Sequence, residues 1–368
     1  MLLQRLSEAN GVSGREEAVR AILLEEIRGR VDSCRVDRMG NLIALKKGSG
    51  GSALRVLVAA HMDEVGLVIT GAEDSGVLRF ATVGGIDERV LPARMVWIGE
   101  RRVPGVIGMK PVHLLDKGER DRVPEARQLY IDVGASGKAE AEKLAGKGET
   151  VVFATEYRTL GSPAGTGAGG DAAAGAAAAS GPGAATGGAR IVQGKAFDDR
   201  AGCALLAALL TERFPFDLVA AFTVQEEVGL RGAQVAAWAE KPDAAVVLEC
   251  TGANEVPSRR DLSPSTRLGA GVSITIRDAS FIADPRLVQL FASTAREKNI
   301  PHQYKQPNIG GTDAGAIHRV REGVPSITLA VPARYIHSPA ALMDLSDFEA
   351  AAVLAREGLE RLPRAFPG

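Results

Sequence analysis

The sequence predicts an α/β domain that is interrupted by an inserted, β-rich domain. Strand-like and helix-like segments alternate near both ends of the chain, whereas short strand-like runs separated by Gly and Pro fill residues 67–160. We therefore expect residues 1–66 and 189–368 to form one domain around this insertion. Residues 161–188 are rich in Ala and Gly and have no apolar face to bury, so a flexible loop is expected there.

The first part of the α/β domain is expected to hold one helix and two strands. Residues 15–28 carry apolar side chains at helical spacing, and Ser13 and Glu16 have the spacing of a capping box at the start of this helix. Residues 41–47 and 53–63 are typical of strands. The second of these is apolar almost throughout, which indicates a strand buried on both faces of a sheet.

The insertion contains six short runs that are typical of strands and end at Gly- or Pro-containing turns. They cover residues 66–72, 76–85, 94–99, 105–110, 128–135 and 150–157. One charged segment, residues 138–147, is expected to be a short helix. Short strands at such regular intervals predict a small β-rich domain.

Helix and strand patterns alternate again after the Ala- and Gly-rich segment. Helices are expected at residues 199–210, 231–239, 285–297 and 346–362, and strands at residues 217–224, 244–250, 272–278 and 326–337. Ser346 and Glu349 have capping-box spacing at the start of the last helix. This alternation indicates that the second part returns to the α/β domain.

Charge and composition exclude several classes of protein. Lys and Arg total 44 against 45 Asp and Glu, and aromatic residues are only 4%, so neither nucleic acid nor an anionic membrane is an expected partner. The N-terminal segment lacks the pattern of a signal peptide, and no apolar run approaches the roughly 20 residues that cross a bilayer. The three cysteines form no CxxC pair. We expect a cytoplasmic protein without disulfides or a thiolate metal site.

Side chains that can bind metal follow the apolar strands. Four strands end in such residues, namely His61, the pair Glu226 and Glu227, Glu249, and His337. Asp198 lies between a Gly-rich segment and a predicted helix. Because sites in open α/β sheets are built at the carboxyl ends of strands, these side chains are expected to converge.

Each of these residues also has an ordinary structural explanation. A lone strand-end His61 is more often hydrogen-bonded than ligating, Asp198 and its neighbour Asp199 suit a helix N-terminus, and Glu226 and Glu227 could be solvated. Together they form a set of two imidazoles and several carboxylates. That set suits two divalent ions with a bridging carboxylate and a bridging water, and Zn²⁺, Co²⁺ and Mn²⁺ all accept it.

The pair Glu226 and Glu227 could divide two tasks. Consecutive residues point to opposite sides, so one could bind metal while the other addresses a bound water. Asp63, two residues after His61, could orient the imidazole. No G-x-S-x-G, phosphate-binding G-x-x-x-x-G-K-[ST] or H-E-x-x-H motif competes with this interpretation. The residues alone predict a two-metal hydrolase.

In these residues and the segments around them, the chain resembles the M42 family of metal-dependent aminopeptidases, some of which have been labelled endoglucanases. The resemblance runs in family order across almost the whole chain. It is carried by GVSGREEAVR, MGNLIALKKG, AAHMDEVGLVI, RVLPARMVWIG, PGVIGMKPVHLL, LYIDVGASGKAEAE, GKAFDDRAGCALL, TVQEEVGLRGA, GGTDAGAIH and EGVPSITLAVPARYIHSP. The glycanase label has no support in the sequence, because aromatic sugar platforms are not evident.

The resemblance implies a role for each candidate residue. His61 and Glu249 would be the terminal ligands of one metal, Glu227 and His337 those of the other, and Asp198 would bridge the two. The family accepts either Asp or Glu at the position of Glu249.

The resemblance also implies residues that act on the water or support the ligands. Glu226 would be the general base that takes a proton from the metal-bridged water and passes it to the leaving amine, and Asp63 would support His61. A glycine-rich loop would line the site, with Asp313 supporting the ligands. Its candidate residues are Gly310, Gly311, Thr312 and Asp313.

As a whole, the resemblance implies a three-layer α/β/α catalytic domain with a mixed sheet and an inserted β-rich dimerisation domain. Family members commonly assemble from dimers into dodecamers with the active sites facing an interior chamber. The expected activity is removal of N-terminal residues from short peptides. Two alternatives stay open, namely another two-metal amide hydrolase such as a deacylase or dipeptidase, and an inactive assembly scaffold.

Overall fold

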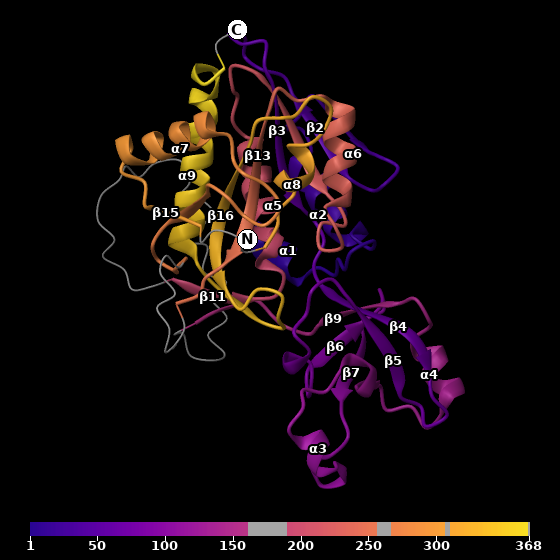
Figure 1. Ribbon diagram of the computed structural model, residues 1–368. Coiled ribbons are helices and arrows are strands. Elements are labelled where there is room, and N and C mark those ends of the chain that lie inside the picture. Colours follow the sequence, from indigo (N-terminus) through magenta and orange to yellow (C-terminus); the bar gives the residue numbers. More distant parts are fainter. Residues whose placement is uncertain (161–189, 256–265, 306–309, 367–368) are drawn as a thin grey trace.

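A computed structural model describes residues 1–160, 190–255, 266–305 and 310–366. Figure 1 shows two bodies, a large α/β body and a smaller β-rich body that projects from it. The predicted loop at residues 161–188 lies outside the described residues. Each body has its own cluster of buried apolar side chains, one around the large sheet and one inside the small domain.

Four adjacent parallel strands form the centre of the large sheet, in the order β12, β3, β13 and β16. They are the apolar runs β12 (Asp217–Thr223), β3 (Arg55–His61), β13 (Ala244–Gly252) and β16 (Ser326–Arg334). Nearly all their residues are buried, as expected for strands that are covered on both faces. Because the strands are parallel, their carboxyl ends meet at one edge.

Antiparallel strands flank this centre and make the sheet mixed. Over the described residues the sheet has 11 strands. One flank holds β1 (Ser33–Val36) and β2 (Leu42–Lys46), and the other holds β17 (Ala341–Asp344), β11 (Ile191–Gly194) and β10 (Arg158–Thr159). A branch from β16 adds β14 (Val272–Thr275) and β15 (His302–Tyr304). Five short strands were not expected from the sequence, namely β1, β10, β11, β15 and β17.

Helices cover both faces of the sheet and complete three layers (Figure 1). On one face α5 (Phe197–Leu209) packs on β3 and β13, and α9 (Leu345–Arg361) packs on β16. The same layer holds α1 (Leu2–Glu8), α2 (Glu17–Ile27) and α7 (Pro285–Glu297). The other face is covered by α6 (Arg231–Glu240) and α8 (Ala314–Ile317). The predicted α/β/α fold class is confirmed.

The inserted domain is a closed six-stranded barrel with the strand order β4, β5, β8, β7, β6 and β9. Its strands are β4 (Gly66–Ala72), β5 (Leu78–Val83), β6 (Met95–Ile98), β7 (Val103–Gly108), β8 (Tyr130–Asp132) and β9 (Thr150–Phe153). The short helices α3 (Lys117–Arg120) and α4 (Lys138–Leu144) lie between them. No helix among the described residues is long and apolar enough to span a membrane.

Both predicted capping boxes are wrong. Helix α2 starts at Glu17 with Glu16 as its N-cap, and within the described residues no side chain caps its first turn. The Ser13 hydroxyl instead donates to Asp63, 2.6 Å away. Helix α9 is capped by Asp344, whose carboxylate accepts the Ser346 amide at 2.8 Å. In neither helix does the serine of the S-x-x-E motif act as the cap. Ser13 bonds to Asp63 outside the helix, and the Ser346 amide is itself capped by Asp344.

Candidate metal centre

The candidate residues converge at the carboxyl edge of the parallel strands. His61 is the last residue of β3 and pairs in register with Thr223, the last residue of β12. Val247 of β13 pairs with Ala59, so Glu249 lies at the level of His61. The shared register therefore brings side chains from separate strands to one height.

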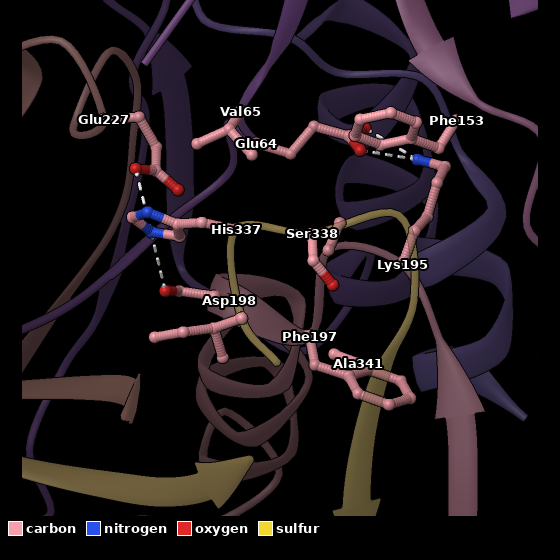
Figure 2. A pocket seen from close by; sticks show the side chains of 12 residues that line it. Glu64, Val65, Phe153, Lys195, Phe197, Asp198, Glu227, His337, Ser338 and Ala341 are labelled. Atoms are coloured by element: carbon pink, nitrogen blue, oxygen red, sulfur yellow. Dashed lines mark hydrogen bonds and ion pairs between the residues drawn. The ribbon is translucent and has the colours of Figure 1, made fainter. Parts of the chain in front are cut away.

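One carboxylate connects the two histidines. Asp198 Oδ1 lies 3.2 Å from His61 Nε2, and Asp198 Oδ2 lies 3.3 Å from His337 Nε2. Figure 2 shows the His337 side of this arrangement, with the ring between Asp198 and Glu227. Asp198 thus directs one carboxylate oxygen to each imidazole. A carboxylate that bridges two metal ions needs this arrangement.

Each histidine also has its own glutamate. Glu249 Oε1 lies 3.4 Å from His61 Nε2, and Glu227 Oε2 lies 3.2 Å from His337 Nε2. The two pairs are those that the family resemblance implied. The site is thus two His–Glu pairs joined by Asp198.

The prediction that all these residues end strands needs three corrections. Glu226 and Glu227 lie beyond the end of β12, which stops at Thr223. Glu249 lies inside β13, which continues to Gly252 because its neighbour β16 also continues, with Gly252 paired to Ala333. His337 comes three residues after β16 ends at Arg334 and has a positive φ of 57°. A turn, rather than the strand itself, therefore returns His337 to the site.

Asp198 and Asp199 have different tasks at the start of α5. Both depart from helical backbone angles. Asp199 accepts the Gly202 amide at 2.8 Å and the His61 amide at 3.1 Å, so it both caps the helix and holds the end of β3. Its neighbour Asp198 is thereby left to face the two histidines. The helix-cap interpretation of this pair holds for Asp199.

Asp63 connects His61 to the turn that carries the two adjacent glutamates. Its backbone oxygen lies 3.1 Å from His61 Nδ1, which leaves Nε2 directed at the cluster. Its carboxylate accepts the amides of Glu226 at 2.9 Å and Glu227 at 3.2 Å. Gln225, just before them, has a positive φ of 57°. Asp63 therefore fixes both a histidine and the Glu226–Glu227 backbone.

The glycine-rich loop lies behind the cluster. The Asp313 carboxylate accepts the Thr223 hydroxyl at the end of β12. Thr312 contacts Asp278 and Thr328. The positive φ of Gly310 (64°) and the proximity of Ser280 to Gly311 explain why the loop uses glycine at these positions. Among the described residues of this loop, only Asp313 forms a hydrogen bond to the end of a central strand, namely to Thr223 of β12.

Several buried oxygens of the cluster lack partners. Glu227 Oε1, Glu249 Oε2 and Asp313 Oδ1 are buried without a hydrogen bond among the described residues. Such atoms are costly unless a cation or donor satisfies them. Among the described residues, His61, Asp198 and Glu227 form one group whose ligand atoms lie within 4.8 Å of one another, and His61, Asp199 and Glu249 form another. The residues present therefore fit divalent metal ions.

The pKa values show how strongly the site requires positive charge. Burial raises the pKa of Glu249 to about 8 and holds that of Glu226 well above its usual range. Burial alone would lower the pKa of His337, but hydrogen bonds to Asp198 and Glu227 raise it to about 11. Both kinds of shift follow from placing several carboxylates and two imidazoles close together in a buried site.

A second buried ion-pair group adjoins the cluster and was not predicted from the sequence. The Glu64 carboxylate accepts hydrogen bonds from Lys195 at 2.7 and 2.8 Å and from Arg200 at 3.1 Å. Arg200 is fully buried and also donates to the backbone oxygens of Met62 and Ala9. Figure 2 shows the Glu64–Lys195 pair on the opposite side of a small pocket from His337. The only signal was the position of these residues beside H-M-D and F-D-D.

The sequence profile of the M42 glutamyl aminopeptidase family matches residues 40–181 and 174–354. The chain belongs to the M42 family. This M42 chain is 30% identical to a lysyl aminopeptidase of Pyrococcus furiosus, over 98% of its own length and 96% of the relative's. Membership makes it a peptidase, a hydrolase that acts on peptides.

Two solved structures of aminopeptidases and peptidases resemble the M42 chain along its length. An aminopeptidase from the archaeon Desulfurococcus kamchatkensis has a TM-score of 0.86 and 35% identity, covering 98% of this chain and 94% of that one. A TET1 peptidase of Pyrococcus horikoshii has a TM-score of 0.79 and 32% identity, covering 96% and 97%. This TET1 peptidase can assemble into a tetrahedron or a large octahedral shell.

Proposed function

We propose that the chain is a two-metal aminopeptidase that removes N-terminal residues from short peptides. The observation that carries the proposal is the Asp198 carboxylate, which lies between two His–Glu pairs. His61 and Glu249 would hold one ion, Glu227 and His337 the other, and Asp198 both. The orphaned oxygens of Glu227 and Glu249 support this assignment.

Glu226 is the proposed general base. When bound, the metals would polarise the scissile carbonyl and lower the pKa of the attacking water. The Glu226 carboxylate would take a proton from that water and donate it to the leaving amine nitrogen. Its backbone is fixed through Asp63, and no recorded hydrogen bond among the described residues occupies its carboxylate. The raised pKa of Glu226 suits a group that must both accept and release a proton.

Metal affinity is expected to increase as the pH is raised from 6 to 8. The pKa of His337 is about 11 without metal, so the metal-free protein carries a proton on this ring throughout that range. Metal binding must displace the proton, which is easier at higher pH. We expect roughly a tenfold gain in apparent affinity per pH unit for each proton released. Competition with a chromophoric zinc chelator at pH 6, 7 and 8 measures it, and a pH-independent affinity would contradict the assignment of His337.

A substrate panel tests the proposed activity. Aminoacyl-p-nitroanilides should be hydrolysed in the presence of Zn²⁺, Co²⁺ or Mn²⁺, whereas N-acyl amino acids should not. The ligand set of imidazole and carboxylate suits all three ions. Activity confined to N-acyl amino acids would favour a deacylase, and activity confined to dipeptides a dipeptidase. Assaying the size fractions of the purified protein separately shows which assembly is active.

We also propose assembly through the barrel domain, with residues 67–160 as its extent and dimers combining into a dodecamer. The support is the presence of six exposed apolar side chains on this small domain, since exposed apolar surface often marks an interaction site. They are Met95, Val106, Met109, Val112, Leu114 and Val123.

A cytoplasmic location is proposed because Cys34 is exposed as a free thiol among the described residues.

A further inference from the structure

We infer that Ser13 and Glu16 are positioning residues that set the turn carrying Glu226 and Glu227. Both belong to a segment, residues 11–16, that we call the amino-terminal strap. The sequence suggested that these two residues cap α2, but the structure uses their side chains for contacts with the site. The inference rests on the proposed function, because it concerns the residue proposed as general base.

Ser13 acts through Asp63. Its hydroxyl donates to Asp63 Oδ2 at 2.6 Å, and the same oxygen accepts the Glu227 amide while Oδ1 accepts the Glu226 amide. Asp63 is fully buried, so no water can substitute freely for a lost donor. Removing the Ser13 hydroxyl therefore takes away one of the hydrogen bonds that orient this carboxylate. The acceptor of both glutamate amides would be held less firmly.

Glu16 holds the residue just before the proposed base. One of its carboxylate oxygens, Oε1, accepts the Gly14 amide at 2.6 Å and the Gln225 amide at 3.3 Å. Gln225 has a φ of 57°, in the left-handed region that residues other than glycine seldom occupy. Such a conformation persists only when its surroundings enforce it. Glu16 is 3% exposed and supplies part of that enforcement.

The strap cannot move away from the site without disrupting the core. The Glu64 amide donates to the Gly11 oxygen at 2.9 Å, and the Gly11 amide donates to the Glu64 carboxylate at 3.1 Å. A Cβ on Gly11 would lie 2.5 Å from Arg200 Nη2, so the packing there is close. The strap thus contacts the segments that contain His61, Asp198 and Glu226. It is a rigid support shared by three parts of the site.

The test compares variants that remove these hydrogen bonds with variants that keep them. Ser13→Ala and Glu16→Ala are expected to lower kcat by about 10- to 100-fold, the usual effect of losing a group that orients a ligand or base. KM and bound metal should stay within about twofold of the wild-type values, because the side chains touch neither substrate nor metal ligands directly. Ser13→Thr and Glu16→Gln retain a hydroxyl and an acceptor oxygen and should restore most of the activity. Glu17→Gln, at an exposed neighbouring position, is the matched control.

Two further measurements separate positioning from a general loss of stability. In a Glu226→Gln background, Ser13→Ala should cause little additional loss, because both act through the same group. Amide hydrogen exchange at residues 225–227 should become faster in both alanine variants, and this measurement needs no substrate. If Glu16→Ala fails to fold, Ser13→Ala still decides the question, because Ser13 is only half-buried.

The inference is overturned if the alanine variants keep wild-type kcat, if their loss appears in KM, or if it adds fully to that of Glu226→Gln. It is also overturned if exchange at residues 225–227 is unchanged. Failure of the proposed function gives a different result. In that case the wild type and Glu17→Gln are both inactive on aminoacyl substrates, and the exchange measurement alone decides the role of the strap.

Discussion

Glu226→Gln is expected to lower kcat by about 10²–10⁴-fold, the range that general acid–base catalysis contributes. The amide of the glutamine cannot take the proton from the attacking water. Every other carboxylate near the cluster, among the described residues, already has a hydrogen-bond or ion-pair partner, so none is free to replace Glu226. Metal content should be unchanged, since the proposed ligands are the neighbouring Glu227 and four other residues. The measurement is steady-state kinetics on an aminoacyl-p-nitroanilide together with metal analysis of the same preparation.

The matched control is Glu142→Gln, an exposed position on α4 of the barrel domain. It should have wild-type kcat and metal content. If Glu226→Gln retained near-normal turnover, Glu226 would not be the base. If it lost metal instead, Glu226 would have to be regarded as a ligand, and the division of tasks between the two adjacent glutamates would be reversed.

Asp198→Asn is expected to remove metal and activity together. The neutral side chain presents one carbonyl oxygen, so it can no longer offer a carboxylate oxygen to each of His61 and His337. We expect fewer metal ions per chain than in the wild type and a loss of at least about 10²–10³-fold in kcat, as for other preorganised electrostatic groups. Metal analysis and kinetics in a metal-supplemented buffer measure both effects.

Asp74→Asn, in an exposed turn of the barrel domain, controls for the charge change itself. A variant at Asp198 with full metal content and wild-type kcat would exclude a bridging role. A third outcome is loss of activity with both metal ions retained. It would mean that Asp198 contributes to the reaction without joining the two metals.

The architecture could be predicted because the pattern of apolar residues follows the layers of the fold. The four central strands are almost wholly apolar, which marked them as strands, and the barrel strands are separated by clear turn residues. Short edge strands such as β10 and β15 have only two or three residues and depend on their neighbours for pairing. Nothing in their local sequence could indicate them.

The convergence of His61, Glu227, Glu249 and His337 could be predicted because parallel strands end at one edge. What the sequence could not indicate is which residue a polar side chain would contact. Ser13 satisfies every local rule of a helix cap, yet its partner Asp63 lies 50 residues further along the chain. The Glu64 ion pairs span still longer separations, and only the folded chain brings them together.

The order of the proposed ligands along the chain has a consequence for how the enzyme matures. His61 precedes the barrel insertion, whereas Asp198, Glu227, Glu249 and His337 follow it. During synthesis the first ligand leaves the ribosome well before the other four, because the barrel insertion lies between them. The barrel can fold while the ligand set is still incomplete. Metal capture would therefore have to wait for both parts of the interrupted domain, and by binding residues from both parts the ions would stabilise their union.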